Sequence, residues 1–374
     1  MKNILVFVNS FDYGGVTEVV KNIYRNLNRQ KYSMDFVSMR CLNSDFEKEI
    51  IDKGDNIYYL SLPPLNRIPF LNYNFRNIEI LKQVKKLIGK NRYDTAHIHA
   101  HADIYTKVAR YLKINRIIIH AHEAVTEFYG NENVSRITNY ILQKRRKLYF
   151  KSAACLAGDS RNACIAKYGK SVENDSRMKI LYPPINTDRF NAGLYTEEEA
   201  VTKFGIDKSA INIIHVGRLS PVKNQKFIMD ILKNLLKLKK SHFYLVGEGE
   251  LREELEEYAK KIGVYENVSF LQGNTSPLIY KGMDCSVLPS ISEAFGMVAV
   301  ESQMMGVPCF LSTNIPRDVD IGMCEFIDLK QGAEFWADEI LEYFENGSKV
   351  KNKTVVNKFT VEELMHSIDE LYSL

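Results

Sequence analysis

Short apolar runs alternate with longer stretches of helical periodicity along almost the whole of this chain. An apolar run of a few residues bounded by turn residues is typical of a strand, and strands that alternate with helices favour a parallel sheet. The second half of the chain repeats the rhythm of the first, so the sequence predicts an α/β protein with two sheets. The expected strands are residues 4–8, 34–38, 57–60, 95–98, 116–119, 154–157, 179–181, 211–216, 243–246, 270–273, 285–288 and 309–311.

Length and composition are those of a soluble two-domain protein. At 374 residues the chain can form two hydrophobic cores. No run approaches the ~18 apolar residues of a membrane span. Residues 1–10 are too short and too quickly polar for a signal peptide. The six cysteines include no Cys-x-x-Cys pair, so they indicate neither a zinc site nor a disulfide framework, and a reducing cytoplasm fits.

Charge is divided unevenly between the two halves. Residues 1–190 hold 31 Lys and Arg against 18 Asp and Glu, a net charge of +13, whereas residues 191–374 hold 19 against 28, a net charge of −9. This asymmetry predicts an anionic partner for the first half, such as nucleic acid, an acidic membrane face or a phosphorylated acceptor. Residues 143–151 place five basic side chains around three apolar ones, which fits a solvated helix face or an amphipathic element on acidic lipid. The apolar segment 62–73 is interpreted as a membrane- or acceptor-contacting flap or as a loop packed on the core.

Residues 288–308, LPSISEAFGMVAVESQMMGVP, place two carboxylates around a predicted helix start. Glu293 lies in the loop before the helix, and Glu301 lies five residues beyond Gly296, about 7 Å along the axis at ~1.5 Å per residue. The free amides and the positive dipole end of a helix start suit a phosphate. Ionised carboxylates accept hydrogen bonds from the hydroxyls of sugar rings on either side of it. The stretch therefore predicts a nucleotide-sugar clamp, although a buried helix with two solvated acids has the same pattern.

Two further turns follow predicted strands. In GRLSPVKN, residues 217–224, Arg218 and Lys223 can converge on one diphosphate, Arg through its planar fork and Lys as a point charge. A solvated loop is the alternative.

Gly14 and Gly15 lie between the first strand and the first helix, where a ligand oxygen can approach backbone amides. They do not match Gly-x-Gly-x-x-Gly, so the sequence does not support an NAD site.

Together these motifs resemble glycosyltransferase family 4. The Glu, seven residues, Glu spacing within SEAFGMVAVES, the GRLSPVKN turn and the turn that begins at Gly247 match this family closely. LYPPINTDRF, residues 181–190, resembles the family's linker, with Pro183 and Pro184 where Asn-Gly is usual. The resemblance implies the GT-B fold, in which two Rossmann-like α/β domains face each other across a deep cleft. The implied divisions are an acceptor-binding domain at 1–190, a nucleotide-sugar-binding domain at 191–356 and a terminal helix at 357–374 that crosses back to the first domain.

The resemblance also implies a retaining hexosyltransferase. It would move a sugar from a nucleotide sugar, a UDP-sugar in preference to a GDP-sugar, to a hydroxyl of a saccharide acceptor. The expected acceptor is a lipid-linked intermediate of bacterial capsule, exopolysaccharide or lipopolysaccharide synthesis. A front-face route is expected, because no carboxylate is an obvious nucleophile on the β-face. Two alternatives remain open: a nucleotide-sugar epimerase on the same fold, and a catalytically silent subunit that activates a partner transferase.

By the same resemblance, Glu293 contacts hydroxyls of the transferred sugar and Glu301 contacts the ribose of the nucleotide. His122 matches a histidine that lies beside the transferred sugar in this family, with a packing histidine as the alternative. The implied catalytic residues are His122, Arg218, Lys223 and Glu293. The implied nucleotide-sugar-binding residues are Gly15, Gly217, Arg218, Lys223, Gly247, Glu293, Phe295, Gly296, Met297 and Glu301.

Two patterns raise the question of a metal. His97, His99 and His101 would share one face of an extended strand, as zinc ligands can, but no acidic or Cys partner has a recognisable spacing. Residues 318–320, Asp-Val-Asp, have the form of the metal motif in the other major glycosyltransferase fold, GT-A. They lie in an apparent surface loop, whereas that motif follows an apolar strand. Both patterns are interpreted as structural, and the sequence predicts neither a cofactor nor an essential metal.

The basic first half predicts a peripheral enzyme on the cytoplasmic face of the membrane, and nucleic acid is disfavoured because no nucleic-acid motif is present. Each Lys or Arg near an anionic bilayer contributes ~1 kcal/mol at low salt. We expect the protein to sediment with anionic liposomes at low salt and to be released at high salt. Replacing Lys144, Arg145, Arg146 and Lys147 together by Ser should weaken sedimentation without changing nucleotide affinity measured by calorimetry. Failure of the wild type to sediment would contradict the membrane assignment.

Overall fold

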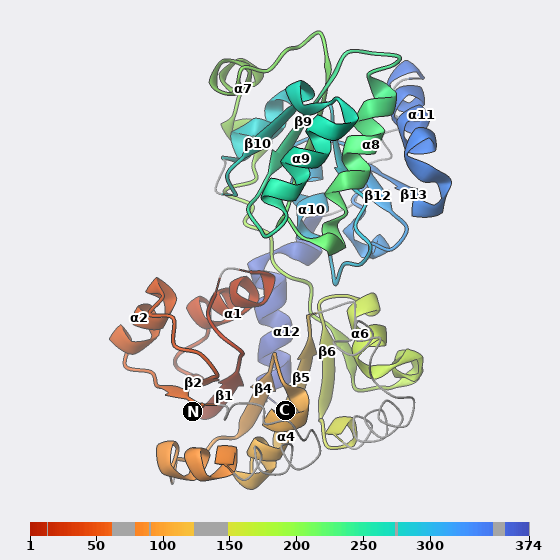
Figure 1. Cartoon of the computed structure of the whole chain (residues 1–374). Helices are drawn as coiled ribbons and strands as arrows, with labels where there is room; N and C mark the ends of the chain where they lie inside the picture. Colours follow the sequence, from red (N-terminus) through yellow and green to blue (C-terminus); the bar gives the residue numbers. More distant parts are fainter. Residues whose placement is uncertain are drawn as a thin grey trace. The chain divides into compact units, whose positions relative to one another are not determined.

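The computed structural model contains two compact units, each built on one parallel sheet. One unit comprises Met1–Pro184 together with Val361–Leu374, and the other comprises Ile185–Thr360. The chain therefore leaves the first unit, completes the second, and returns to the first for its last helix (Figure 1). The residues described are 1–12, 14–61, 79–89, 91–122, 149–273, 276–346 and 356–373.

Within the described residues, the sheet of the first unit has seven strands: β1 (Lys2–Phe7), β2 (Tyr32–Ser38), β3 (Ile57–Tyr59), β4 (Thr95–Ile98), β5 (Arg116–Ala121), β6 (Cys155–Gly158) and β7 (Met178–Ile180). Every neighbouring pair is parallel, and the order is β3-β2-β1-β4-β5-β6-β7. The chain thus winds outward from β1 in one direction and then, from β4, in the other. Such a switch point leaves room for ligands at the carboxyl ends of the strands.

The helices that cover this sheet include α1 (Gly15–Arg25), α2 (Asp45–Asp52), α4 (Ala102–Tyr111), α6 (Arg161–Tyr168) and α12 (Val361–Ser373). They form two cores, because successive side chains of a strand point to opposite faces. Ile4 and Val6 of β1 pack in one core with side chains from α1, α2 and α12. Leu5 and Phe7 pack in the other with α4, α6 and the helical residues 79–87. The strands are therefore apolar on both faces.

The last helix, α12, is held to the first unit by packing and by basic groups at its end. Ile368 and Tyr372 are fully buried in the core that β1 and β2 also form. Lys2 Nζ donates to the carbonyl of Tyr372 at 3.1 Å, and Arg116 Nε donates to that of Leu371 at 2.7 Å. Positive groups are favourable here, because the last carbonyls of a helix lack partners within it and carry partial negative charge.

Six strands of the described residues form the sheet of the second unit: β8 (Ile211–Val216), β9 (Ser241–Val246), β10 (Val268–Leu271), β11 (Cys285–Leu288), β12 (Cys309–Ser312) and β13 (Cys324–Ile327). They are parallel, in the order β10-β9-β8-β11-β12-β13. The winding direction changes between β8 and β11. The loops that follow these two strands therefore leave the sheet side by side at its carboxyl edge.

The helices of the second unit include α7 (Glu197–Phe204), α8 (Gln225–Leu235), α9 (Arg252–Ile262), α10 (Met297–Met304) and α11 (Gly332–Glu345). Trp336 of α11 is fully buried, and its ring meets that of Phe227 on α8 edge to face, with the centroids 5.6 Å apart. These rings pack in one core with Ile213 of β8 and Phe243 of β9. The core lies directly beneath the strands that carry the predicted site.

The expected strands are all present, with ends that shift by no more than two residues. β13 is absent from the expected set, because only its first and last residues are buried and its pattern resembles a loop. The unit boundaries lie after Pro184 and Thr360, where the expected divisions are at 190 and 356. Segments 62–73 and 143–148 lie outside the described residues. Among the helices that are described, none is long and apolar enough to cross a bilayer.

Ile368→Ala should destabilise the first unit by about 2–5 kcal/mol, because a fully buried side chain is replaced by a cavity. His366→Ala, on the exposed side of the same helix, should change the free energy of unfolding by less than about 0.5 kcal/mol. Chemical denaturation followed by circular dichroism measures both. Equal effects of the two substitutions would contradict the packing of α12.

Candidate active site

The residues expected to bind a nucleotide sugar lie at the carboxyl ends of strands, the edge at which parallel sheets gather their ligand-binding loops. Gly217, Gly247 and Glu293 follow β8, β9 and β11, which are neighbours in the order β9-β8-β11. Gly15 and His122 follow β1 and β5 in the first unit. The second unit therefore supplies most of the predicted residues by itself.

Gly217 and Gly247 let two loops of the second unit meet backbone to backbone. A Cβ atom added at Gly247 would lie 1.9 Å from the carbonyl oxygen of Gly217. The amide of Gly217 donates to the carbonyl of Val246 at 2.9 Å. A side chain at position 247 would force these loops apart, so this glycine fixes the loop that carries the predicted diphosphate-binding residues.

Lys223 and Glu293 form an ion pair. Lys223 ends a short 3₁₀ helix, η3 (Pro221–Lys223), and its Nζ donates to Oε1 of Glu293 at 2.5 Å. Ser290 Oγ donates to the same oxygen at 2.8 Å. The two charged side chains retain only 20% and 12% of their exposure, so their attraction is screened less than that of a surface pair. The pair fixes a cation and a carboxylate in the loops after β8 and β11.

The residues on both sides of Lys223 are hydrogen-bonded to the loop before α10. The amide of Ile291 donates to the carbonyl of Val222 at 2.8 Å, and Asn224 Nδ2 donates to the carbonyl of Pro289 at 3.2 Å. These bonds flank Lys223 in the sequence. They therefore position its ammonium group relative to Glu293.

Among the described residues, no side chain caps the start of α10. Gly296 occupies the N-cap with φ of 102°, and the first turn contains no acidic residue. The helix begins at Met297, directly after Gly296, whose backbone conformation favours glycine. The partial positive charge of the first amides is therefore not offset by a local acid. Phe295 is buried, with its ring centroid 5.4 Å from that of Phe359, and anchors the loop, whereas Met297 is half-buried.

Glu301 lies further along α10, in an enclosed position. Burial raises the pKa of Glu301 to about 7, and the nearby charge of Arg189 opposes that rise. Burial also raises the pKa of Tyr280, and the charge of Glu301 adds to the effect. A carboxyl group that titrates near neutral pH is common at functional sites, because structural acids are usually exposed or paired.

Arg218 does not converge with Lys223 in this structure. Its side chain is 74% exposed, and Nη2 lies 3.2 Å from Oε2 of Glu250. Gln225 Nε2 donates to the carbonyl of Arg218 at 2.8 Å, which fixes the backbone while the guanidinium remains in solvent. An exposed pair contributes little to stability, so the guanidinium can exchange Glu250 for an anionic ligand at small cost.

Gly14 and Gly15 leave open space at the start of α1. A Cβ added at either position would meet no atom within 4 Å from the part of the chain that the structure describes, its immediate chain neighbours aside. A ligand oxygen can therefore reach the first amides of this helix, as the sequence predicts.

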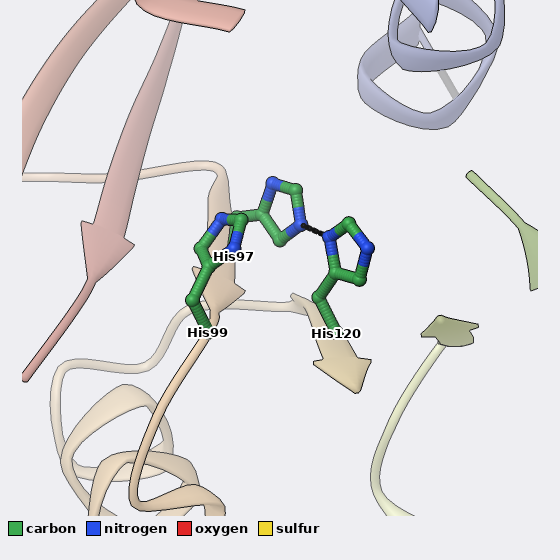
Figure 2. Close-up of side chains that lie close together, drawn as sticks. All are labelled: His97, His99 and His120. Atoms are coloured by element: carbon green, nitrogen blue, oxygen red, sulfur yellow. Dashed lines mark hydrogen bonds between the residues drawn. The ribbon is translucent and has the colours of Figure 1, made fainter. Parts of the chain in front are cut away.

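Four histidines gather at the carboxyl ends of β4 and β5 in the first unit. Figure 2 shows the rings of His97, His99 and His120 close together, with Nε2 of His97 3.3 Å from Nδ1 of His120. His122 completes the group, and its Nε2 lies 2.7 Å from Nδ1 of His99. The side chain of His122 is only 3% exposed. The histidine expected to lie beside the sugar thus has its ring inside the protein.

Asp159, directly after β6, joins this cluster. Its Oδ1 lies 3.1 Å from Nε2 of His120, and its Oδ2 lies 2.9 Å from Nδ1 of His122. Burial alone would raise the pKa of Asp159, but the charge and hydrogen bonds of the two histidines outweigh it and lower the pKa to about 2. Burial lowers the pKa of His120 to about 4 and the pKa values of His97 and His99 well below their usual range. At neutral pH the cluster therefore holds an ionised carboxylate together with the neutral imidazoles of His97, His99 and His120.

Among the residues that the structure describes, two groups bring ligand atoms close enough together for a metal ion. One comprises His97, His99 and His120, and the other comprises His120, His122 and Asp159. Within each group the atoms lie within 4.8 Å of one another. Neutral imidazole and carboxylate are zinc ligands, so the composition of both groups is compatible with that metal.

The expectation that His97, His99 and His101 share one strand face is wrong. β4 ends at Ile98, and His101 takes a left-handed conformation with φ of 44° at the N-cap of α4. Its Nε2 lies 2.9 Å from Oδ1 of Asn9, away from the cluster. A tight turn at the end of a strand breaks the alternation on which the expectation rested.

The Asp-x-Asp motif has a local role. Arg317–Val319 forms a 3₁₀ turn, η6, in which Val319 is fully buried. Oδ1 of Asp320 accepts from the amide of Gly322 at 2.8 Å. Neither Asp318 nor Asp320 belongs to a metal-compatible group of the described residues.

Three residues of these sites were not predicted from the sequence: Asp159, Ser290 and Gln225. Asp159 follows an expected strand at the same edge as His122, and Ser290 lies three residues before Glu293. The positions of Asp159 and Ser290 in the sequence could therefore have identified them as site residues. The position of Gln225 could not, because its contact to the backbone depends on how the loop folds over α8.

Two family profiles match successive parts of the chain. The profile described as Glycosyltransferase Family 4 matches residues 13–189, and the one described as Glycosyl transferases group 1 matches residues 196–321. The chain belongs to glycosyltransferase family 4. The expectation of an enzyme that transfers a glycosyl group is thereby confirmed.

Curated relatives of this family 4 member extend over most of its length. A putative glycosyltransferase, EpsF of Bacillus subtilis, is 27% identical over 91% of this chain and 87% of its own. A UDP-Gal:alpha-D-GlcNAc-diphosphoundecaprenol alpha-1,3-galactosyltransferase of Escherichia coli is 22% identical over 88% of this chain and 89% of its own.

Solved structures share the fold. HepE from Anabaena, in complex with UDP and glucose, has a TM-score of 0.72 at 16% identity, and the match covers both chains completely. WaaG, a glycosyltransferase involved in lipopolysaccharide biosynthesis, has a TM-score of 0.63 at 18% identity, over 99% of this chain and 97% of its own. The expected GT-B class, with two Rossmann-like α/β domains, is confirmed.

Glu301→Gln should stabilise the protein at pH 8. The pKa of Glu301 is about 7 in the folded protein against an ordinary 4.5, so the folded state binds the proton more tightly. Ionisation above pH 7 then costs up to about 3 kcal/mol of stability, which the neutral amide avoids. At pH 5 the folded-state carboxyl is protonated, so the gain should be smaller.

Thermal unfolding at both pH values measures this effect. Glu257→Gln, on the exposed face of α9, is the matched control and should change stability little at either pH. A Glu301→Gln variant no more stable than the wild type at pH 8 would show that the carboxyl group is not destabilised by burial.

Proposed function

We propose that this glycosyltransferase moves a hexose from a nucleotide sugar to a hydroxyl of a saccharide acceptor, with retention of the anomeric configuration. The observation that carries the proposal is the ion pair of Lys223 and Glu293 in loops bonded to each other before the uncapped start of α10. Glu301 lies on the same helix. This arrangement offers a cation and amide dipoles to a diphosphate, and carboxylates to the rings on either side of it.

The main catalytic effect is stabilisation of the leaving diphosphate. Negative charge develops on it as the glycosidic bond breaks, and preorganised cations and amides lower the barrier. The ammonium of Lys223 has three N–H donors, so one can remain on Glu293 while others reach phosphate oxygens. The exposed Arg218 supplies a second cation after it releases Glu250.

The two carboxylates have different tasks. Glu293 receives both Lys223 and Ser290 on Oε1, and no donor among the described residues reaches its Oε2. That oxygen is therefore available to hydroxyls of the transferred sugar. Glu301 accepts from the ribose hydroxyls, and its pKa of about 7 keeps much of it ionised at neutral pH.

We propose that catalysis needs no metal and no other cofactor, because Lys223, Arg218 and the helix start supply the positive charge that a divalent cation would otherwise provide. The anomeric carbon gains positive character as the diphosphate departs. The acceptor hydroxyl then attacks from the same face, which gives retention without a covalent intermediate.

A UDP-sugar is the proposed donor, and a lipid-linked saccharide is the proposed acceptor. HepE has been solved with UDP-glucose, and the Escherichia coli relative is named for a UDP-Gal donor and a diphosphoundecaprenol-linked acceptor. The positive charge of residues 1–190 supports an acceptor that carries phosphate. It also supports the proposal that the enzyme acts at the cytoplasmic face of the membrane.

The test is nucleotide release from UDP- and GDP-sugars, with and without candidate acceptors. We expect release to depend on an acceptor. Lys223→Ala should lower turnover about 10²–10³-fold, because a preorganised donor to the leaving group is lost. Lys226→Ala is the matched control, since Lys226 is exposed and pairs with Glu254. It should remain near the wild-type rate, and circular dichroism should show both variants folded.

Near-native turnover by Lys223→Ala would refute the diphosphate assignment. Interconversion of the donor sugar without an acceptor would identify an epimerase, and absence of any release would identify a silent partner subunit. Loss of activity in EDTA, restored by Mn²⁺, would refute the metal-free mechanism.

A further inference from the structure

The histidine cluster of the first unit forms one continuous chain of hydrogen bonds with Asp159 inside it. From Oδ1 of Asp159 one arm passes through His120 at 3.1 Å and on to Nε2 of His97 at 3.3 Å. It ends at the hydroxyl of Tyr372 on α12, 2.8 Å from Nδ1 of His97. All three side chains beyond the carboxylate are fully or almost fully buried.

The second arm is shorter and ends at His99. From Oδ2 of Asp159 it passes to Nδ1 of His122 at 2.9 Å, and from Nε2 of His122 to Nδ1 of His99 at 2.7 Å. His99 retains 7% of its exposure. In the described part of the chain no donor or acceptor contacts Nε2 of His99.

The carboxylate determines where the protons lie. Ionised Asp159 only accepts, so Nε2 of His120 and Nδ1 of His122 must carry the protons that they donate to it. A neutral imidazole has one donor and one acceptor nitrogen. Nδ1 of His120 therefore accepts from Nε2 of His97, and Nε2 of His122 accepts from Nδ1 of His99.

The two ends of the chain consequently differ in character. At the buried end, the hydroxyl of Tyr372 donates to Nδ1 of His97, so that end is satisfied within the protein. At the other end, Nε2 of His99 has a lone pair and no proton. It is the acceptor through which the chain can bind a ligand.

Between His99 and His122, which belong to different metal-compatible groups, the spacing favours a shared proton over a shared metal ion. Two imidazole nitrogens on one tetrahedral zinc lie about 2.0–2.1 Å from it and therefore ~3.4 Å from each other. Nδ1 of His99 and Nε2 of His122 are 2.7 Å apart, a hydrogen-bond distance. Their lone pairs cannot both point to one zinc ion without movement of the rings.

We infer that Nε2 of His99 accepts a hydrogen bond from a substrate hydroxyl, and that Asp159, acting through His122, is the positioning residue that keeps it an acceptor. The inference rests on the proposed function, because donor sugar and saccharide acceptor both offer hydroxyl donors. It also changes the role of His122. Both ring nitrogens of His122 are bonded within the protein, so its side chain orients His99 and does not contact the sugar.

The first test reads the tautomers directly, on the full chain labelled with ¹⁵N-histidine. Long-range ¹H–¹⁵N correlation at neutral pH should show the proton on Nδ1 of His99 and His122 and on Nε2 of His97 and His120. Asp159→Asn should alter the pattern at His122 and His99. UDP-glucose or a free monosaccharide acceptor should shift the Nε2 resonance of His99. A proton on Nε2 of His99 in the wild type would overturn the inference.

The second test separates the two sources of the hydroxyl. His99→Ala should raise KM about 3- to 10-fold for the substrate that donates, as expected for one hydrogen bond, with a smaller effect on kcat. Titration of the UDP-sugar at saturating acceptor reports the donor sugar, and titration of the acceptor at saturating UDP-sugar reports the other substrate. His99→Gln, which restores an acceptor oxygen, should recover most of the loss, and the exposed His366→Ala should show none.

The outcomes are distinguishable from failure of the proposed function. Unchanged KM for both substrates in His99→Ala would overturn the inference while transfer itself continues. One zinc ion bound per wild-type chain, and lost in His99→Gln, would replace it by a metal site. If the wild type transfers no sugar at all, the proposed function fails. The tautomers are then still read from the spectra. If no sugar shifts the Nε2 resonance of His99, the hydroxyl site is rejected as well.

Discussion

Both units of this protein depend on parallel sheets whose two faces are covered by helices. In such a sheet the strands are apolar on both sides, and a polar side chain can reach a ligand only where a strand ends. Glu293 follows β11, His122 follows β5 and Asp159 follows β6. The chemistry of the protein is therefore confined to the carboxyl edges, and the order of strands decides which loops lie together.

The two carboxyl edges manage buried charge in opposite ways. Asp159 receives hydrogen bonds from two histidines, so its pKa falls to about 2. Its ionised form stabilises the fold above the ordinary aspartate pKa, and that contribution is lost as the pH falls through 2. Glu301 has no comparable donors among the described residues, and its pKa rises to about 7. Ionised Asp159 thus stabilises the fold, whereas ionised Glu301 destabilises it. A role in binding explains why a destabilising carboxylate occupies position 301.

The terminal helix connects the fold of the first unit to the histidine chain. α12 comes from the far end of the sequence, and its Ile368 and Tyr372 complete a core that β1 begins. The hydroxyl of Tyr372 also provides the last hydrogen bond to His97. Packing of this helix therefore satisfies a buried imidazole nitrogen that would otherwise lack a partner, and stability and site geometry share the same contacts.

The sequence by itself determined the α/β class, nearly all the strands, and the motifs that place Lys223, Glu293 and Glu301 in one family of enzymes. These features are local: apolar runs define strands, and Gly296 ahead of an apolar stretch defines the helix start. Only the tertiary structure decided which distant groups meet. Lys223 reaches Glu293 because β8 and β11 are neighbours, and Asp159 reaches His122 because β5 and β6 are neighbours, whereas His101 turns away after β4 ends. No spacing in the chain encodes these pairings, because strand order brings them about through packing over the whole unit.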